Sequence, residues 1–203
     1  MDNLNLKIRA ISGDLLRNEK LYFFEKLTDQ RLKAKAKINV NVRIVESEDF
    51  PKIAKRFENL LETEAINRSK MGHICFGAEL NGEFVHSTWV SFNNAYVGPL
   101  ERKLRVSSDS AYIYDIFTVP EYRGLQIAPK VFSDVLNYLR DIRKIKKIYV
   151  SISHTNYSSL RVAKKEGLRK IGAIKYVRIC RWRLYRFQGE TKEDHNKLKQ
   201  MLL

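Results

Sequence analysis

The sequence has little of several features that define particular protein classes. Two cysteines and four prolines in 203 residues are too few for a disulfide framework, a thiolate metal cluster or a proline-rich linker. No apolar run approaches the roughly 18–20 residues that cross a bilayer, and the start, MDNLNLKIRAISGD, lacks the parts of a signal peptide. We expect a soluble cytoplasmic protein in which Cys75 and Cys180 are free, buried thiols; a single bridge between them is the alternative.

Acidic residues are scarce in the second half. Residues 1–100 hold 15 basic and 13 acidic side chains, whereas residues 101–203 hold 23 and 10, so most of the net charge of +15 lies there. Within 140–186, Asp141 and Glu166 are the only acids among 15 Lys and Arg. Such a surface attracts polyanions: nucleic acid, an anionic membrane, an acidic carrier protein or the phosphates of a small molecule. Lysines that only solubilise exposed faces explain the same excess.

Hydrophobic spacing predicts the elements of the first half. Apolar residues at mixed three- and four-residue intervals predict helix over 1–37, for which core packing is the default and a lid, a packing arm or a dimer contact are alternatives. Asn81-Gly82 stands between two strand-like runs and predicts a tight hairpin. In chain order we expect a strand at 38–44, a helix from Pro51 to about Ser69, strands near 73–80 and 83–92, and a loop over 93–110.

The second half alternates strands and helices. AYIYDIFTV is rich in β-branched and aromatic residues, and a short turn, PEYRGLQIA, follows it directly. Gly167 is a natural residue to end a helix. The expected elements are a strand at 111–119, a helix from Pro129, a strand in KIYVSIS, a short helix from about Ser158 to Glu166, and a hairpin of 168–177 and 178–187.

The turn between the 111–119 strand and the next helix predicts an anion site. The first turn of a helix leaves about four N–H groups without intrahelical partners and carries about half a positive charge. Arg123 and Lys130 add full charges, Gly124 permits a close approach of the backbone, and Pro129 suits a first turn although it removes one N–H. The patterns of a P-loop and of a dinucleotide fingerprint are both absent.

Two motifs in this half resemble a known family. TVPEYRGLQIAPKVF looks like the acyl-CoA-binding motif, [RQ]-x-x-G-x-[GA], of the GNAT superfamily of N-acetyltransferases. SISHTNYSSLRVAKKEGLRKIG is similar to the superfamily's next motif, in which an Asn precedes a small helix, a Gly and a hydrophobic residue. The resemblance covers roughly 38–187, and the two motifs stand at the expected spacing within 111–172.

The resemblance implies a fold and a domain organisation. The fold class is mixed α/β (α+β): a central, mostly antiparallel mixed sheet with a splayed strand pair, flanked by helices. The implied organisation is an N-terminal helical extension at 1–37, an acyl-CoA-dependent acyltransferase domain at 38–190, and a C-terminal tail at 191–203.

The resemblance also implies which residues contact acetyl-CoA, the expected co-substrate. The backbone of three residues at the end of the 111–119 strand would pair with the pantetheine arm. Six residues of the following turn would line the pyrophosphate through their N–H groups. Two residues after the next strand would complete the site. In that order they are Ile116, Phe117 and Thr118; Arg123, Gly124, Leu125, Gln126, Ile127 and Ala128; and Asn156 and Ser159. No metal is implied.

Three positions depart from the family pattern. Gln126 stands where the motif has its central Gly, so the loop must accommodate a residue with a Cβ atom. Many members carry a Tyr seven residues after the Asn as a general acid, and here that position is Ala163. The Glu that some relatives carry five residues before the Asn is replaced by Ser151.

Catalytic residues must therefore be sought elsewhere. Amide formation from a thioester needs a neutral amine, and so a base, together with donors for the developing oxyanion. Asp115, on the cofactor strand, is the first candidate base; pairing with a basic side chain is its alternative role. His86 and His154 come next, with a structural role as the alternative. Other residues are further candidates with packing as their default: Tyr114 and Tyr149 as proton donors, and Trp89 and Phe92 as walls of the acceptor site.

Three functions are compatible with these observations. The first is an acyl-CoA-dependent N-acyltransferase, most simply an acetyltransferase, acting on the amine of a small molecule; a phosphate-bearing amine would suit the basic face. The second is an acyltransferase that takes its acyl group from an acidic acyl-carrier protein. The third is a non-catalytic module of this fold that binds nucleic acid through the basic half, although no nucleic-acid motif is present.

Overall fold

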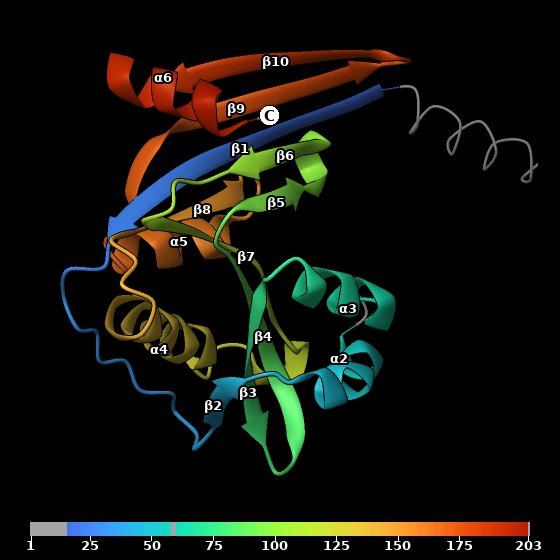
Figure 1. Ribbon diagram of the computed structural model, residues 1–203, viewed down its shortest axis with the longest axis vertical. Coiled ribbons are helices and arrows are strands. Elements are labelled where there is room, and N and C mark those ends of the chain that lie inside the picture. Colours follow the sequence, from blue (N-terminus) through green and yellow to red (C-terminus); the bar gives the residue numbers. More distant parts are fainter. Residues whose placement is uncertain (1–15, 58–59, 203) are drawn as a thin grey trace, which may run out of the picture. The chain divides into compact units, whose positions relative to one another are not determined.

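A computed structural model describes residues 16–57 and 60–202 (Figure 1). The chain divides into two compact units, which are treated one at a time. Unit 1 consists of Met1–Glu25, Tyr96–Arg105 and Ser151–Leu203, and unit 2 of Lys26–Ala95 and Val106–Val150.

Unit 2 contains most of the predicted strands. The hydrogen-bonded order is β8-β7-β4-β3-β2, in which β7 and β8 are parallel and the other neighbours are antiparallel. The predicted hairpin is confirmed: Asn81 and Gly82 take φ values of 50° and 84° between β3 and β4. The strands are β2 (Asn41–Ile44), β3 (Ile74–Leu80), β4 (Glu83–Ser91), β7 (Ser110–Thr118) and β8 (Lys147–Ser153), which runs on into unit 1.

Helices cover both faces of this sheet. In Figure 1, α4 (Ile127–Asp141) lies on one side of β3, β4 and β7, and α2 (Phe50–Arg56) and α3 (Glu62–Lys70) lie on the other. The single helix predicted from Pro51 to Ser69 is thus wrong. The backbone turns extended at Phe57 (φ −112°, ψ 104°), whose fully buried ring packs in a core with Phe50, Ile53 and Trp89.

Unit 1 corrects the prediction at the start of the chain. Residues 16–27 form a strand, β1 (Leu16–Leu27), and not a helix; residues 1–15 lie outside the described part. In this unit β9 (Arg169–Ile179) pairs antiparallel with both β1 and β10 (Trp182–Gly189), which confirms the predicted final hairpin. The pattern misled because Leu21 and Phe23 alternate inward but Phe24 is also buried, next to a bulge between Phe23 and Phe24.

Other elements of the C-terminal region form around these strands. The short helix α5 (Tyr157–Lys165) is close to its predicted bounds, and the predicted tail contains a helix, α6 (Lys192–Met201), which packs against β9 and β10. The expected loop at 93–110 is partly wrong, because β5 (Asn94–Val97) and β6 (Arg102–Arg105) pair within it.

A buried carboxylate ties the turn before β6 to the sheet of unit 1. Glu101 accepts hydrogen bonds from Tyr176, Arg17, Arg178 and Arg183 at 2.7–3.2 Å. The Tyr176 hydroxyl and then the three guanidinium groups lower the pKa of Glu101 to about 2, against the opposing effect of burial. The carboxylate is therefore charged over the whole physiological range.

Some sequence expectations concern the molecule as a whole. Cys75 and Cys180 are free, as expected, but Cys180 is exposed and not buried. Within 16–57 and 60–202, no group of three or more His, Cys, Asp or Glu side chains is placed so that it could bind a metal ion. None of the helices in the same ranges has the length and apolar character needed to cross a membrane.

Candidate active site

The segment between β7 and α4 forms a turn that holds one acidic side chain, Glu121, and one basic side chain, Arg123. A 3-10 turn, Pro120–Tyr122, leads from β7 into the loop, and α4 begins at Ile127, two residues before the predicted start. Among the described residues no side chain caps this helix end and its first turn holds no acid. The N–H groups of Ile127 and Ala128 therefore have no intrahelical acceptor, and such groups favour an anion.

Two residues of this turn adopt the left-handed backbone conformation. Gly124 has φ +78°, and a Cβ atom there would meet nothing within 4 Å. Gln126, which replaces the glycine of the motif, has φ 60° and ψ 25°. The conformation that a glycine would adopt freely is thus held by a residue with a Cβ atom, at a cost in strain.

Arg123 lies back against the end of β7. Its Nε donates to the Thr118 carbonyl at 3.0 Å, and its guanidinium lies 5.7 Å from the centre of the Phe117 ring. The side chain is exposed, so its charge contributes to the turn without being buried. Together, the uncapped helix end, the open Gly124 and Arg123 suit an anionic group such as a phosphate.

The strand before this turn leaves its parallel neighbour. β7 and β8 pair only from Ser110 and Lys147 to Ile113 and Val150, while β7 continues to Thr118. This confirms the predicted splay. On the other side of β7, two residues between Tyr114 and Phe117 lie opposite one residue between Trp89 and Ser87 of β4, and the extra residue is accommodated at Asp115, with φ 49°.

His86 is fully buried beneath the end of β7. Its Nδ1 lies 2.7 Å from Thr118 Oγ1 and its Nε2 lies 2.8 Å from Thr88 Oγ1. Burial lowers the pKa of His86 to about 3, so the ring is neutral and one nitrogen donates while the other accepts. This candidate base thus contacts the predicted cofactor strand at Thr118 from inside the protein.

Asp115 is held in an ion pair that the sequence did not identify. Arg68 of α3 donates to its carboxylate at 2.7 Å and also bonds Glu64. The guanidinium lies 5.0 Å from the Trp89 ring centre and 5.1 Å from that of Tyr114. Burial lowers the pKa of Arg68, but the nearby Tyr114 and Asp115 outweigh it and raise the pKa overall.

Tyr114 makes a hydrogen bond to a second residue that the sequence did not identify. Its hydroxyl lies 2.6 Å from His73 Nδ1, and His73 Nε2 lies 2.9 Å from the Asn94 carbonyl. A carbonyl only accepts, so Nε2 carries the proton and Nδ1 accepts from the Tyr114 hydroxyl. Burial raises the pKa of Tyr114 above its usual range and lowers that of His73, which keeps both groups neutral.

The remaining predicted site residues belong to unit 1. Exposed His154 interacts with the Lys20 carbonyl, at 3.2 Å from its Nδ1. The Asn156 side chain caps α5, accepting from the Ser159 N–H at 3.1 Å and from the Ser158 hydroxyl at 2.9 Å. Ala163, at the family's tyrosine position, is buried. These contacts leave the cofactor role of Asn156 and Ser159 and the catalytic role of His154 as predictions.

The other aromatic candidates, Trp89, Tyr149 and Phe92, are buried or half-buried. Trp89 is 1% exposed and lies in the core under α2 and α3, with its indole N–H unpartnered among the described residues. Tyr149 is buried, and half-buried Phe92 lies under Arg143, whose guanidinium is 4.3 Å from its ring centre.

Local sequence carried little information about Arg68 and His73. The Glu64–Arg68 spacing of four residues is typical of a helical ion pair, but it does not indicate Asp115, 47 residues away. His73 stands just before β3, and its contact with Tyr114 follows only from the placement of the two strands on either side of β4.

Comparison with known families agrees with this geometry. The model of the acetyltransferase (GNAT) family matches residues 41–168, which is more than half of the chain. The chain therefore belongs to the GNAT acetyltransferase family. No curated protein gives a significant match.

Solved structures share the fold at low sequence identity. A GCN5-related N-acetyltransferase from Sphaerobacter thermophilus has a TM-score of 0.58 and 12% identity, over 90% of this chain and 57% of its own. A GNAT-family acetyltransferase from Novosphingobium aromaticivorans has a TM-score of 0.55 and 14% identity, over 78% and 63%. AAC(6')-Iy, in complex with the bisubstrate analogue CoA-S-monomethyl-acetylneamine, has a TM-score of 0.50 and 14% identity, over 64% and 90%.

The matched lengths differ among these proteins. The alignments span between 56% and 66% of the first four similar structures, whose chains are therefore longer than the part they share with this one. At these identities the likeness concerns the fold.

Proposed function

We propose that the protein is an N-acetyltransferase that moves an acetyl group from acetyl-CoA to the amine of a small molecule. The observation that carries this proposal is the sequence of β7, the turn with Gly124 and Gln126, and the uncapped start of α4. The free N–H groups at the start of α4 suit the pyrophosphate of acetyl-CoA. β7 continues beyond its last pair with β8, so the backbone of Ile116, Phe117 and Thr118 would pair with the pantetheine arm, apart from the Thr118 carbonyl, which accepts from Arg123.

Acetyl-CoA would supply the acetyl thioester, and the chain would orient it and manage protons. We place the attacking amine at Asp115, whose carboxylate would bind the ammonium and take a proton. Arg68 holds that carboxylate from one side, which fixes its direction. The C–N bond forms as the C–S bond breaks, and a backbone N–H of β7 after the bulge would stabilise the oxyanion.

The departing thiolate requires a proton, and the Tyr114 hydroxyl, which in the free protein donates to His73 Nδ1, would turn to donate it to the sulfur. The hydroxyl stays protonated because burial raises the pKa of Tyr114. The resulting tyrosinate would be stabilised by the Arg68 charge, which lies 5.1 Å from the ring centre. His86 would act as a positioning residue for Thr118, because it is buried and neutral.

A calorimetric titration of acetyl-CoA tests the cofactor site. We expect saturable binding by the wild type, which Arg123→Glu abolishes because it reverses the charge at the turn. Lys55→Glu is the matched control, since it makes the same charge change at an exposed position of α2. Absence of acetyl-CoA binding by the wild type would overturn the proposal. So would an equal loss of affinity in the Arg123→Glu and Lys55→Glu variants. A screen of amines by thiol release then identifies the acceptor.

A further inference from the structure

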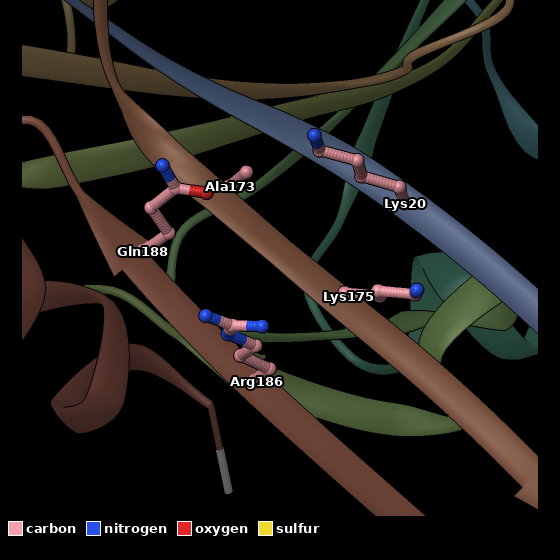
Figure 2. Close-up of a pocket in the computed structure, with 5 residues that line it drawn as sticks. All are labelled: Lys20, Ala173, Lys175, Arg186 and Gln188. Carbon is pink, nitrogen blue, oxygen red and sulfur yellow. The ribbon is translucent and has the colours of Figure 1, made fainter.

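A cavity of about 200 Å³ lies on the sheet of unit 1. Figure 2 shows its five lining residues on three neighbouring strands: Lys20 on β1, Ala173 and Lys175 on β9, and Arg186 and Gln188 on β10. All five belong to unit 1, and none is part of the candidate active site in unit 2.

Three cations form a row across this surface. Lys20 is directly opposite Lys175, which is directly opposite Arg186, so all three side chains are on one face of the sheet. Adjacent strands are about 4.8 Å apart, and like charges directly opposite one another destabilise a sheet. No described carboxylate forms an ion pair with any of the three. Lys20 Nζ lies 5.2 Å from the centre of the Tyr22 ring, but no described carboxylate offsets the repulsion along the row, and such costs are typical of binding sites.

The next row creates the hollow beside these charges. Ala173 lies between Tyr22 and Gln188, and its short side chain leaves space where the flanking residues are long. The cavity is smaller than the roughly 300–1,000 Å³ of sites that enclose a whole ligand. It therefore suits one compact anionic group, such as a phosphate, with Gln188 as an additional donor.

Along the strands, an aromatic side chain lies on the same face on each side of the row of cations. Tyr22 is half-buried, and Trp182, opposite Ile179, is 68% exposed. The seven residues from Ala173 to Ile179 span about 20 Å of β9. Exposed Leu184 lies between Trp182 and the cations. The Tyr22 ring already contacts Lys20 and Lys170, so the face combines a charge row with exposed apolar contacts on the side of Leu184 and Trp182.

Each exposed ion pair is weak, so this surface favours a polymeric ligand that carries several negative charges. An ion pair at the surface contributes little, so three of them hold a lone phosphate only loosely. A polymer adds further phosphates and, if it carries bases, stacking on aromatic rings. We propose that this face of β1, β9 and β10 binds single-stranded nucleic acid, with one backbone phosphate in the hollow at Lys20, Lys175 and Arg186 and a base on Trp182.

Fluorescence anisotropy with a labelled single strand of about ten nucleotides tests this proposal. We expect binding that weakens steeply between about 50 and 200 mM salt. The variant Lys175→Gln/Arg186→Gln removes two of the three cations around the one phosphate and should reduce the slope of log K against log salt by up to about 0.7, the value for one phosphate contact on a single strand. Trp182→Ala should lower the affinity about tenfold and leave that slope unchanged.

The matched control is Lys192→Gln/Lys199→Gln. It removes the same charge from exposed positions of α6 that do not line the cavity, so its slope should equal that of the wild type. Thermal melting establishes that each variant is folded. Since none of these readouts involves acetyl transfer, the result is independent of the proposed function.

Three results would overturn the proposal. The first is absence of binding by the wild type at about 50 mM salt. The second is an equal change of slope in both double variants, which would reflect net charge alone. The third is equal or tighter binding of poly-glutamate or of phosphatidylserine vesicles at the same charge concentration, which would assign the face to an acidic protein or to a membrane surface.

Discussion

The Tyr114 hydroxyl lies 2.6 Å from Nδ1 of His73, and this contact joins the start of β3 to the strand proposed to bind the cofactor. The Asn94 carbonyl accepts from the other ring nitrogen and so fixes the tautomer of His73. Nδ1 therefore carries no proton, so it accepts a hydrogen bond from the Tyr114 hydroxyl and donates none to it.

Replacing Tyr114 by Phe tests the proposed proton donor. We expect kcat to fall about 100-fold, because general acid catalysis contributes 10²–10⁴, while acetyl-CoA binding measured by calorimetry stays unchanged. Tyr96→Phe, which removes an exposed hydroxyl, should have no effect. An unchanged kcat in the Tyr114 variant would assign the hydroxyl to packing.

Replacing Arg68 by Leu should destabilise the protein. Asp115, whose side chain is 25% exposed, would lose the guanidinium beside it, and removing one partner of a largely buried pair costs about 3 kcal/mol. Arg68→Lys should cost less but remain harmful, because an ammonium group cannot form the same forked, stacked contacts. Urea unfolding measures both, with Glu64→Gln, at a more exposed partner, expected to change stability by less than about 0.5 kcal/mol.

Position 126 should respond favourably to glycine. Gln126→Gly removes the strain of a side chain in the left-handed region, worth about 1–2 kcal/mol, and part of this gain is lost to the greater freedom of glycine in the unfolded chain. The expected net gain is up to about 1 kcal/mol in thermal unfolding. Gly124→Ala is the reverse test: its Cβ would meet no atom, so any loss of stability reports the backbone alone.

Stability at acid pH should depend on Glu101. Its pKa of about 2 lies below the ordinary 4.5, so the stabilisation is fully present above pH 4.5 and is lost as the pH falls from there through about 2. Glu101→Gln should lower stability at neutral pH and flatten the acid-unfolding curve within that window. Identical curves for the two proteins, measured by circular dichroism, would contradict this role.

Removing the middle charge of the cation row should stabilise the free protein. Lys175 faces a cation on each side, and Lys175→Gln relieves both repulsions, for a gain of about 0.5 kcal/mol. The gain should disappear at about 1 M salt, where the screening length falls to about 3 Å. Melting temperatures at low and high salt, with Lys199→Gln as the control, provide the measurement.

The sequence was most informative where the signal is local. The Asn81-Gly82 turn, the helix after the turn at Gly124 and the final hairpin depend on neighbouring residues, and all three are present. β1 was misread because its apolar spacing fits a helix almost as well, while its strand form depends on pairing with β9, which begins more than 140 residues later.

The candidate site divides in the same way. The turn with Gly124 and Gln126 could be located from a motif, because the function proposed for it depends on the backbone and on consecutive residues. The partners of Asp115 and Tyr114 could not, since Arg68 and His73 reach them from other elements. The sequence predicts that Asp115 is either a base or the partner of a basic side chain. The ion pair with Arg68 confirms the role as a partner, and the role as a base stays a prediction.

The pairing of Leu16 with Ile179 has a consequence for biosynthesis. The ribosome makes β1 more than 140 residues before β9, so one edge of β1 exposes unpaired N–H and C=O groups until β9 has been made. The pairing of β1 with β9 can form only after that, and such distant pairing is slow. The nascent chain should therefore be the form of this protein most prone to aggregate and most dependent on chaperones.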